Sequence, residues 1–128
     1  MRIFLAGASG VIGRRLTPLL RSAGHDVIGT TRSAEGARKL EAAGVRPAIV
    51  DVYDAAALER AAAAAQPHVV IHQLTDLPHV FDKEQLAASY PRNARIRVEG
   101  TRNLIAAARA SDARRFICLL YTSPSPRD

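Results

Sequence analysis

Short apolar segments recur along the chain and alternate with longer segments of helical periodicity. Apolar residues dominate each short segment, and glycine, proline or polar residues bound it. A strand buried on both faces needs such a run, whereas a half-exposed strand alternates apolar and polar side chains. The pattern therefore predicts buried strands at residues 2–6, 26–31, 47–52 and 68–74, and the start of a fifth at 113–117.

The segments between these strands show the spacing of amphipathic helices. In the first of them, apolar residues at i, i+4, i+7, i+8 and i+11 share one helical face: Ile12, Leu16, Leu19, Leu20 and Ala23. Gly24 ends that helix, Asp54 is a favourable N-cap, and Pro91 suits the first turn of another helix. The predicted helices lie at 11–23, 34–43, 55–66, 83–88 and 91–110.

The order of these elements predicts the fold class. Strands that alternate with helices form a parallel sheet through right-handed crossovers, and the helices cover both faces. We therefore expect an α/β protein with a doubly wound parallel sheet of the Rossmann type, cut short after the start of the fifth strand.

Composition narrows the class of protein further. The chain has 128 residues, a formal net charge of +6 and 48% hydrophobic positions, which suits one globular domain. No run approaches the ~18 apolar residues of a membrane span, so no membrane association is expected. The single cysteine, Cys118, excludes an internal disulfide framework and predicts a cytoplasmic protein. No Cys or His cluster has the spacing of a metal site.

Residues 118–128 do not continue the preceding pattern. Alanine disappears, and a Ser-Pro-Ser-Pro segment arrives just after a strand has begun. The peptide matches one reading frame of a transposase-type sequencing adapter over eleven codons; the alternative is a disordered Pro/Ser tail. We therefore expect a native, incomplete domain at 1–117 and a non-native tail at 118–128.

A glycine motif joins the first predicted strand to the first helix, with the sequence Gly7-Ala8-Ser9-Gly10-Val11-Ile12-Gly13. Gly7 allows a sharp turn, Gly10 allows a pyrophosphate to approach the backbone, and Gly13 allows the helix to pack closely on the sheet. The free amides and positive dipole end at Val11 and Ile12 would hold the phosphates. The motif predicts a dinucleotide site that includes Ser9, against the alternative of a glycine-rich turn without a ligand.

The end of the second strand indicates which dinucleotide binds. An NAD-preferring site carries an acid about 20 residues after the glycines, which bonds the adenosine ribose. Here the strand ends in Thr31-Arg32-Ser33 without an acid. The Arg32 guanidinium has the planar, charged geometry that binds a 2′-phosphate. NADP is therefore predicted over NAD, against the alternative that Arg32 is an ordinary solvated arginine.

Several segments together resemble the extended, epimerase/dehydratase-like branch of the short-chain dehydrogenase/reductase superfamily. The glycine spacing is G-x-x-G-x-x-G, Asp51-Val52 resembles the pair that contacts adenine, and residues 98–104 resemble the "N-x-x-G-T-x-N-L" helix. Residues 69–75 resemble the "V-I-H-x-A-A" segment along the cofactor, which implies contacts from Gln73, Leu74 and Thr75. Two departures are Arg97 in place of an asparagine, and Gln73-Leu74-Thr75 in place of small residues.

The resemblance implies an enzyme whose catalytic part is missing from this chain. In that family a Ser or Thr and a Tyr-x-x-x-Lys pair follow the fifth strand, so the catalytic residues are unknown and expected beyond Ile117. The intact parent would be an NAD(P)-dependent oxidoreductase or epimerase that transfers hydride at a carbonyl or alcohol carbon of a small molecule. It would also form a homodimer through the 91–110 helix. The alternative is a non-catalytic NADP-binding sensor on the same fold.

Two other features of the sequence have both a functional and a simpler structural interpretation. His72 could act as a general base, but its place in an apolar strand favours a packed, hydrogen-bonded side chain. Arg95, Arg102 and Arg109 form a stripe at seven-residue spacing. Because no aromatic residues interleave this stripe, it is interpreted as a solvated helix face, and nucleic acid is not expected as a partner.

Overall fold

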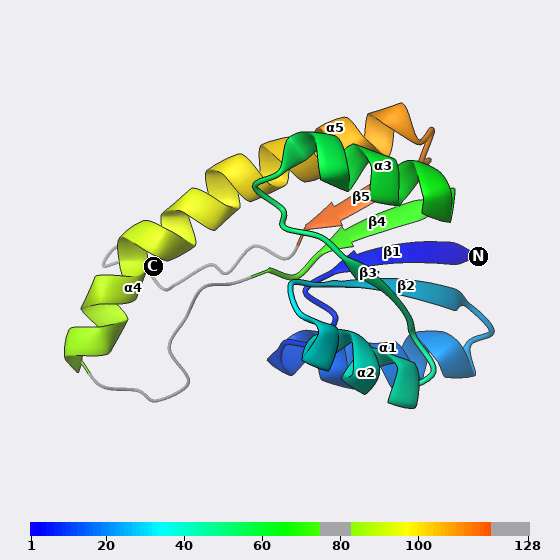
Figure 1. The fold of residues 1–128 in the computed structure, drawn as a ribbon, viewed down its shortest axis with the longest axis horizontal. Helices are drawn as coiled ribbons and strands as arrows, with labels where there is room; N and C mark the ends of the chain where they lie inside the picture. The colour runs from blue at the N-terminus through cyan, green and yellow to red at the C-terminus, as the bar shows by residue number, and fades with distance from the viewer. Residues whose placement is uncertain (75–82, 119–128) are drawn as a thin grey trace, which may run out of the picture.

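The computed structural model describes residues 1–74 and 83–118, and Figure 1 shows their arrangement. The strands are β1 (Arg2–Ala6), β2 (Asp26–Thr31), β3 (Arg46–Ile49), β4 (Val69–His72) and β5 (Arg115–Cys118). The helices are α1 (Val11–Ser22), α2 (Ala34–Ala42), α3 (Ala55–Ala65), α4 (Lys83–Arg95), the π-helix η1 (Ile96–Gly100) and α5 (Thr101–Ala110).

The five strands form one parallel sheet in the order β3-β2-β1-β4-β5. The chain begins at the central strand, proceeds to one edge and then returns to build the other side. This order confirms the doubly wound α/β prediction. It also makes β1 and β4 the strands between which the direction of winding changes, and ligands bind at such a point, beyond the carboxyl ends of the strands.

Helices cover both faces of the sheet, as Figure 1 shows, with α1 and α2 on one side and α3 and α5 on the other. Side chains of β1 alternate between the two layers: Ile3 and Leu5 pack with Leu40 of α2, and Phe4 packs with Leu58 of α3 and with α5. Because β1 is buried on both faces, its sequence is almost wholly apolar, and this is the property from which it was predicted.

The long helical segment differs from its prediction. The expected short helix at 83–88 and long helix at 91–110 are joined, because α4 continues through Pro91 into η1 and α5. Pro91 cannot donate to the carbonyl of Ala87, but both residues lie on the exposed side of the helix. The next carbonyl, of Ala88, accepts a bond of 3.2 Å from the Arg92 side chain.

Two strands are shorter than predicted. β3 ends at Ile49 instead of residue 52, and β4 ends at His72 instead of residue 74. The Val50 amide still donates to the Thr31 carbonyl at 2.9 Å, and the Gln73 amide to the Ala6 carbonyl at 2.8 Å. Beyond these bonds the chain leaves the sheet, so the apolar pattern extends past the ladder, to Val52 after β3 and to Leu74 after β4. Cys118 ends β5, and residues 119–128 lie outside the described part.

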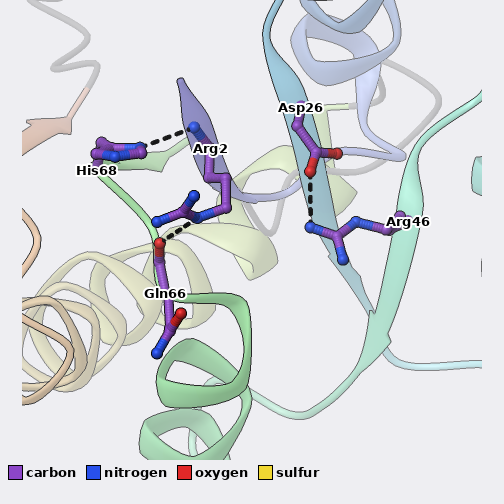
Figure 2. A network of polar contacts seen from close by, with 5 residues as sticks. All are labelled: Arg2, Asp26, Arg46, Gln66 and His68. Atoms are coloured by element: carbon purple, nitrogen blue, oxygen red, sulfur yellow. Dashed lines mark hydrogen bonds and ion pairs between the residues drawn. The ribbon is translucent and has the colours of Figure 1, made fainter.

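Polar contacts fasten the amino ends of the strands (Figure 2). The Arg2 amide donates to Nδ1 of His68 at 2.9 Å, and Arg2 Nε donates to the Gln66 carbonyl at 2.7 Å. Arg46 pairs with Asp26 across β2 and β3 at 2.8 Å. Since these contacts lie at the end where the strands begin, they leave the carboxyl ends available for a site.

Candidate functional site

The glycine turn after β1 has the geometry that its sequence predicts. Gly7 has φ +89°, and the Gly10 amide donates to the Gly7 carbonyl at 3.1 Å. A Cβ on Gly7 would lie 2.7 Å from the Gln73 carbonyl oxygen, and a Cβ on Gly13 would overlap the Gly7 and Ala8 carbonyls. The turn therefore has space only for glycine at positions 7 and 13, where β4 and α1 approach it.

The glycine turn places the first residues of α1 at the carboxyl edge of the sheet, where their backbone amides can bind a ligand. Gly10 is the N-cap residue and has no side chain to cap them, and the first turn of α1 contains no acid. The first amides of a helix have no partner within the helix and carry its positive dipole end. This terminus can therefore accept an anion such as a pyrophosphate.

A cavity of about 340 Å³ lies at the carboxyl ends of the strands. Ten of the twelve predicted cofactor residues line it: Gly7, Ser9, Gly10, Val11, Ile12, Arg32, Asp51, Val52, Gln73 and Leu74. Gly13 is absent from the lining because it packs α1 against the turn. Thr75 lies outside the described residues. The fold thus brings together predicted residues from four separate loops.

The end of β2 presents a positive side chain beside this cavity. Arg32 is exposed and lines the cavity, and within residues 1–74 and 83–118 it has no ion pair. Asp26, the one acid of β2, lies at the opposite end of the strand and pairs with Arg46. Ser33 caps α2 by accepting a bond of 3.0 Å from the Gly36 amide, and its hydroxyl hydrogen stays available as a donor.

The loop after β3 is held by its own carboxylate and by the long helix. An Asp51 carboxylate oxygen accepts from the Tyr53 amide at 2.9 Å, and the Asn103 side chain of α5 donates to the Val52 carbonyl at 2.8 Å. The Arg95 guanidinium lies 3.9 Å from the centre of the Tyr53 ring and pairs with Glu99 at 3.3 Å. Arg95 is exposed, as a solvated helix face requires, and in addition it contacts the loop after β3 through the Tyr53 ring.

His72 is buried, as its apolar strand indicated. Its side chain is 3% exposed, and its Nδ1 accepts a bond of 3.1 Å from the Leu74 amide. Burial lowers the pKa of His72, and a hydrogen bond to the Ile96 backbone opposes part of that shift. A buried, hydrogen-bonded histidine that does not line the cavity fits the packed interpretation and not the general-base one.

Sequence reasoning missed several residues of the site. Tyr53, Leu58, Thr30 and Ile96 also line the cavity. Tyr53 directly follows the Asp51-Val52 pair, so its position was a usable signal. Ile96 is different, because the sequence places it only within the predicted 91–110 helix, and the π-turn that begins at this residue has no sequence signature.

Other kinds of site find no support in the described part of the chain. Residues 1–74 and 83–118 contain no group of three His, Cys, Asp or Glu side chains able to hold a metal ion. Among the helices of the same residues, none combines the length and apolar character needed to cross a bilayer.

The fold and the site define a dinucleotide-binding protein of the Rossmann type: a doubly wound sheet, a glycine turn and a cavity at the point where winding reverses. Comparison with known sequences identifies the group within that class. The chain belongs to the NAD dependent epimerase/dehydratase family, which it matches over residues 3–122. This agrees with the resemblance inferred from the motifs.

Individual relatives agree with this assignment. The chain is 42% identical over 117 residues to a 3-diazoavenalumate denitrifying reductase from a Streptomyces species, a match that covers 91% of this chain and 36% of the relative. It is 28% identical to the Bordetella bronchiseptica enzyme WbmG in complex with NAD, with a TM-score of 0.69, over 92% of this chain and 36% of that one.

A further solved structure shares the fold. Yeast methylglyoxal/isovaleraldehyde reductase Gre2, complexed with NADPH, is 23% identical and has a TM-score of 0.69 over 92% of this chain and 36% of that chain. The chain spans about a third of the length of these relatives. Both NAD and NADPH thus occur on this fold.

Proposed function

We propose that this chain is the NADP-binding part of an oxidoreductase or epimerase that transfers hydride between nicotinamide and a carbonyl or alcohol carbon. The observation that supports this proposal is that Arg32 and the amino end of α1 line the same cavity. These two features suit the two separate phosphate groups of NADP, a 2′-phosphate and a pyrophosphate. The nicotinamide would supply the hydride, and the protein would position it.

The preference for NADP rests on charge at the end of β2. NAD binding is favoured by a carboxylate that accepts from the ribose hydroxyls, but the one acid of β2 lies at its other end. Within residues 1–74 and 83–118 the Arg32 guanidinium has no ion pair, so it can attract a 2′-phosphate, whereas it would stabilise a neutral 2′-hydroxyl much less. The Streptomyces relative is named a reductase, which supports a reductive activity for the intact parent without assigning its substrate.

The chain itself is proposed to bind the cofactor without turning over substrate. No Tyr-x-x-x-Lys pair occurs in its 128 residues, and the resemblance assigns proton transfer to that pair. We expect NADPH binding but no NADPH oxidation with a panel of ketones and aldehydes, measured at 340 nm. Steady turnover by the purified 128-residue chain would contradict this part of the proposal.

Titration with NADPH and NADH, followed by their fluorescence, tests the cofactor preference. Arg32→Ala removes the charge-assisted bond to the 2′-phosphate, so the Kd for NADPH should rise about tenfold to a hundredfold. The Kd for NADH should stay nearly unchanged. The matched control is Arg60→Ala, which removes an exposed arginine of α3 that does not line the cavity.

Two results would contradict the preference for NADP. One is tighter binding of NADH than of NADPH by the unaltered chain. The other is an equal rise in the Kd values for NADPH and NADH in the Arg32→Ala variant, which would mean that Arg32 does not contact the 2′-phosphate.

A further inference from the structure

The long helix α4–η1–α5 contacts the loop that follows β3 at two neighbouring residues. The Asn103 side chain of α5 donates to the Val52 carbonyl at 2.8 Å, across 51 positions of the chain. The Arg95 guanidinium of α4 lies 3.9 Å from the centre of the Tyr53 ring, on the next residue of the loop. The helix therefore holds the loop by a hydrogen bond to its backbone and by a cation–π contact to a side chain.

The helix also packs closely on the loop between these two contacts. An ion pair of 3.3 Å with Glu99, one helical turn later, orients the Arg95 guanidinium. The buried Gly100 leaves room for the loop, since a Cβ at this position would lie 3.7 Å from a methyl carbon of Val52. From Arg95 to Asn103, about two helical turns thus face the same short segment.

The loop presents both a hydrogen-bond acceptor and apolar surface to the cavity. Val50, Asp51, Val52 and Tyr53 all line it. One carboxylate oxygen of Asp51 accepts from the Tyr53 amide at 2.9 Å, and the other oxygen can accept from a ligand. The valines and the tyrosine ring provide apolar contacts beside this acceptor. A planar base with an exocyclic amine matches both features.

We propose that Asn103 and Arg95 are positioning residues for the adenine end of the cofactor, because they hold the loop at 51–53 where it receives the base. This inference rests on the proposed function. Neither side chain lines the cavity, so each acts through the loop residue that it contacts.

The sheet order places the adenine end at this loop. Arg32 follows β2 and Asp51 follows β3, and both lie on the same side of the glycine turn after β1. With the 2′-phosphate at Arg32 and the pyrophosphate at the turn, the adenosine half lies over β2 and β3 and the nicotinamide half over β4. Displacement of the loop should therefore weaken the contacts of the base and leave those of the nicotinamide unchanged.

Two cofactor analogues that differ only in the base test this role. NADPH carries adenine, whereas reduced nicotinamide hypoxanthine dinucleotide phosphate carries an oxygen in place of the exocyclic amine. In the unaltered chain we expect the Kd of the hypoxanthine analogue to be about tenfold higher, because the Asp51 carboxylate then faces an acceptor. The ratio of the two Kd values therefore measures how well the loop receives the base.

Asn103→Leu removes the donor to the Val52 carbonyl and keeps a branched side chain. The Kd for NADPH should rise about tenfold, because the loop loses a buried hydrogen bond and Asp51 its alignment with the amine. The Kd for the hypoxanthine analogue should change little, so the ratio falls towards one. General damage to the fold would instead raise both Kd values and leave their ratio unchanged.

Arg95 allows a milder change at an exposed position. Its side chain is 57% exposed, so Arg95→Met should fold like the unaltered chain. We expect the Kd for NADPH to rise about twofold to fivefold, and Arg95→Lys to restore most of the affinity because it keeps a cation over the ring. Arg102→Met is the matched control, since Arg102 is an exposed arginine of α5 that does not line the cavity. It should leave both Kd values unchanged.

A double-mutant cycle shows whether Arg95 acts through Tyr53. In a Tyr53→Ala background, Arg95→Met should raise the Kd for NADPH no further, because the ring that it orients is already gone.

The outcomes are distinguishable. If the unaltered chain binds neither analogue, the proposed function fails and this inference fails with it. If it binds both analogues equally, or if Asn103→Leu leaves the ratio of Kd values unchanged, the positioning role is wrong while the proposed function stands. Should Asn103→Leu not fold, Arg95→Met decides. An effect equal to that of Arg102→Met, or one that persists in the Tyr53→Ala background, would overturn the inference.

Discussion

Two glycines illustrate how single residues control this site. Gly7 has a positive φ and lies against the Gln73 carbonyl, while Gly13 is helical and lies against the Gly7 and Ala8 carbonyls. At both positions the constraint is backbone against backbone, so no side-chain rotation can relieve it. A methyl group there must shift the strand end, the helix or both, and each of these lines or supports the cavity.

Gly13→Ala should therefore lower the free energy of unfolding by about 1–3 kcal/mol, the usual cost of overpacking. Gly100→Ala is the matched control, since a Cβ on this helical glycine would meet side chains and no backbone atoms, Ile96 at 3.3 Å and Val52 at 3.7 Å. Alanine also has the better helix propensity, by up to about 1 kcal/mol. Urea unfolding of both variants measures the difference, and equal effects would contradict the close packing of α1 on the turn.

Among the elements, the long helix α4–η1–α5 supports the site from the face of the sheet that α3 also covers. Asn103 holds the Val52 carbonyl, Arg95 covers the Tyr53 ring, and Ile96 reaches the cavity itself. The π-turn at Ile96–Gly100 lies between these contacts. Such a turn changes the rotational phase of the residues after it, and π-turns are frequent at functional sites. Pro91, within α4, has no amide hydrogen and therefore leaves one bond of the helical ladder unmade.

Pro91→Ala restores a backbone donor opposite the Ala87 carbonyl. We expect the free energy of unfolding to rise by about 1–3 kcal/mol, because the gain within the helix exceeds the entropy returned to the unfolded chain. Pro47→Ala, in the edge strand β3, should change it by less than about 1 kcal/mol. Denaturant unfolding of the two variants checks this, and a destabilised Pro91→Ala would show that the helix does not continue through residue 91.

For the whole molecule, one buried histidine connects stability to pH. Burial lowers the pKa of His72 in the folded chain below its ordinary value of about 6.5. Below pH 6.5 the His72 side chain takes up a proton more readily in the unfolded chain than in the folded chain. The free energy of unfolding therefore decreases as the pH falls. Carboxylates with ordinary pKa values near 4 hardly titrate above pH 5.5.

The free energy of unfolding should therefore be lower at pH 5.5 than at pH 7.5, and the difference should be smaller in His72→Asn. Urea unfolding at the two pH values measures both quantities. A difference that stays unchanged in the variant would assign the acid sensitivity to another group, such as His68. Partial desolvation and the positive charges of Arg2, the N-terminal amine and Arg114 also lower the pKa of His68.

The sequence could predict the strands, the parallel sheet and most of the phosphate-binding turn, because these follow from local rules. A uniform apolar run such as residues 2–6 suits only a strand covered on both faces, and Gly13 meets its steric constraint at Gly7 and Ala8, close by in the chain. The constraint on Gly7 comes from the distant Gln73 carbonyl, although its positive φ is a local property of the turn. The long helix was predicted less well. Pro91 predicted the start of a helix, but the helix continues through this residue, which lies on its exposed side.

Tertiary structure alone decided which distant residues complete the cavity. Asn103 and Val52 are 51 positions apart in the chain. His72 and Ile96 come from different elements, and Arg95 meets Tyr53 because the long helix packs beside α3, over β4 and β5. Periodicity fixes the face that a segment buries but not the segment that it meets, because partners are chosen by packing across the whole sheet. The sequence by itself therefore determined a Rossmann-type nucleotide site, and the packing of remote segments determined the walls that shape it.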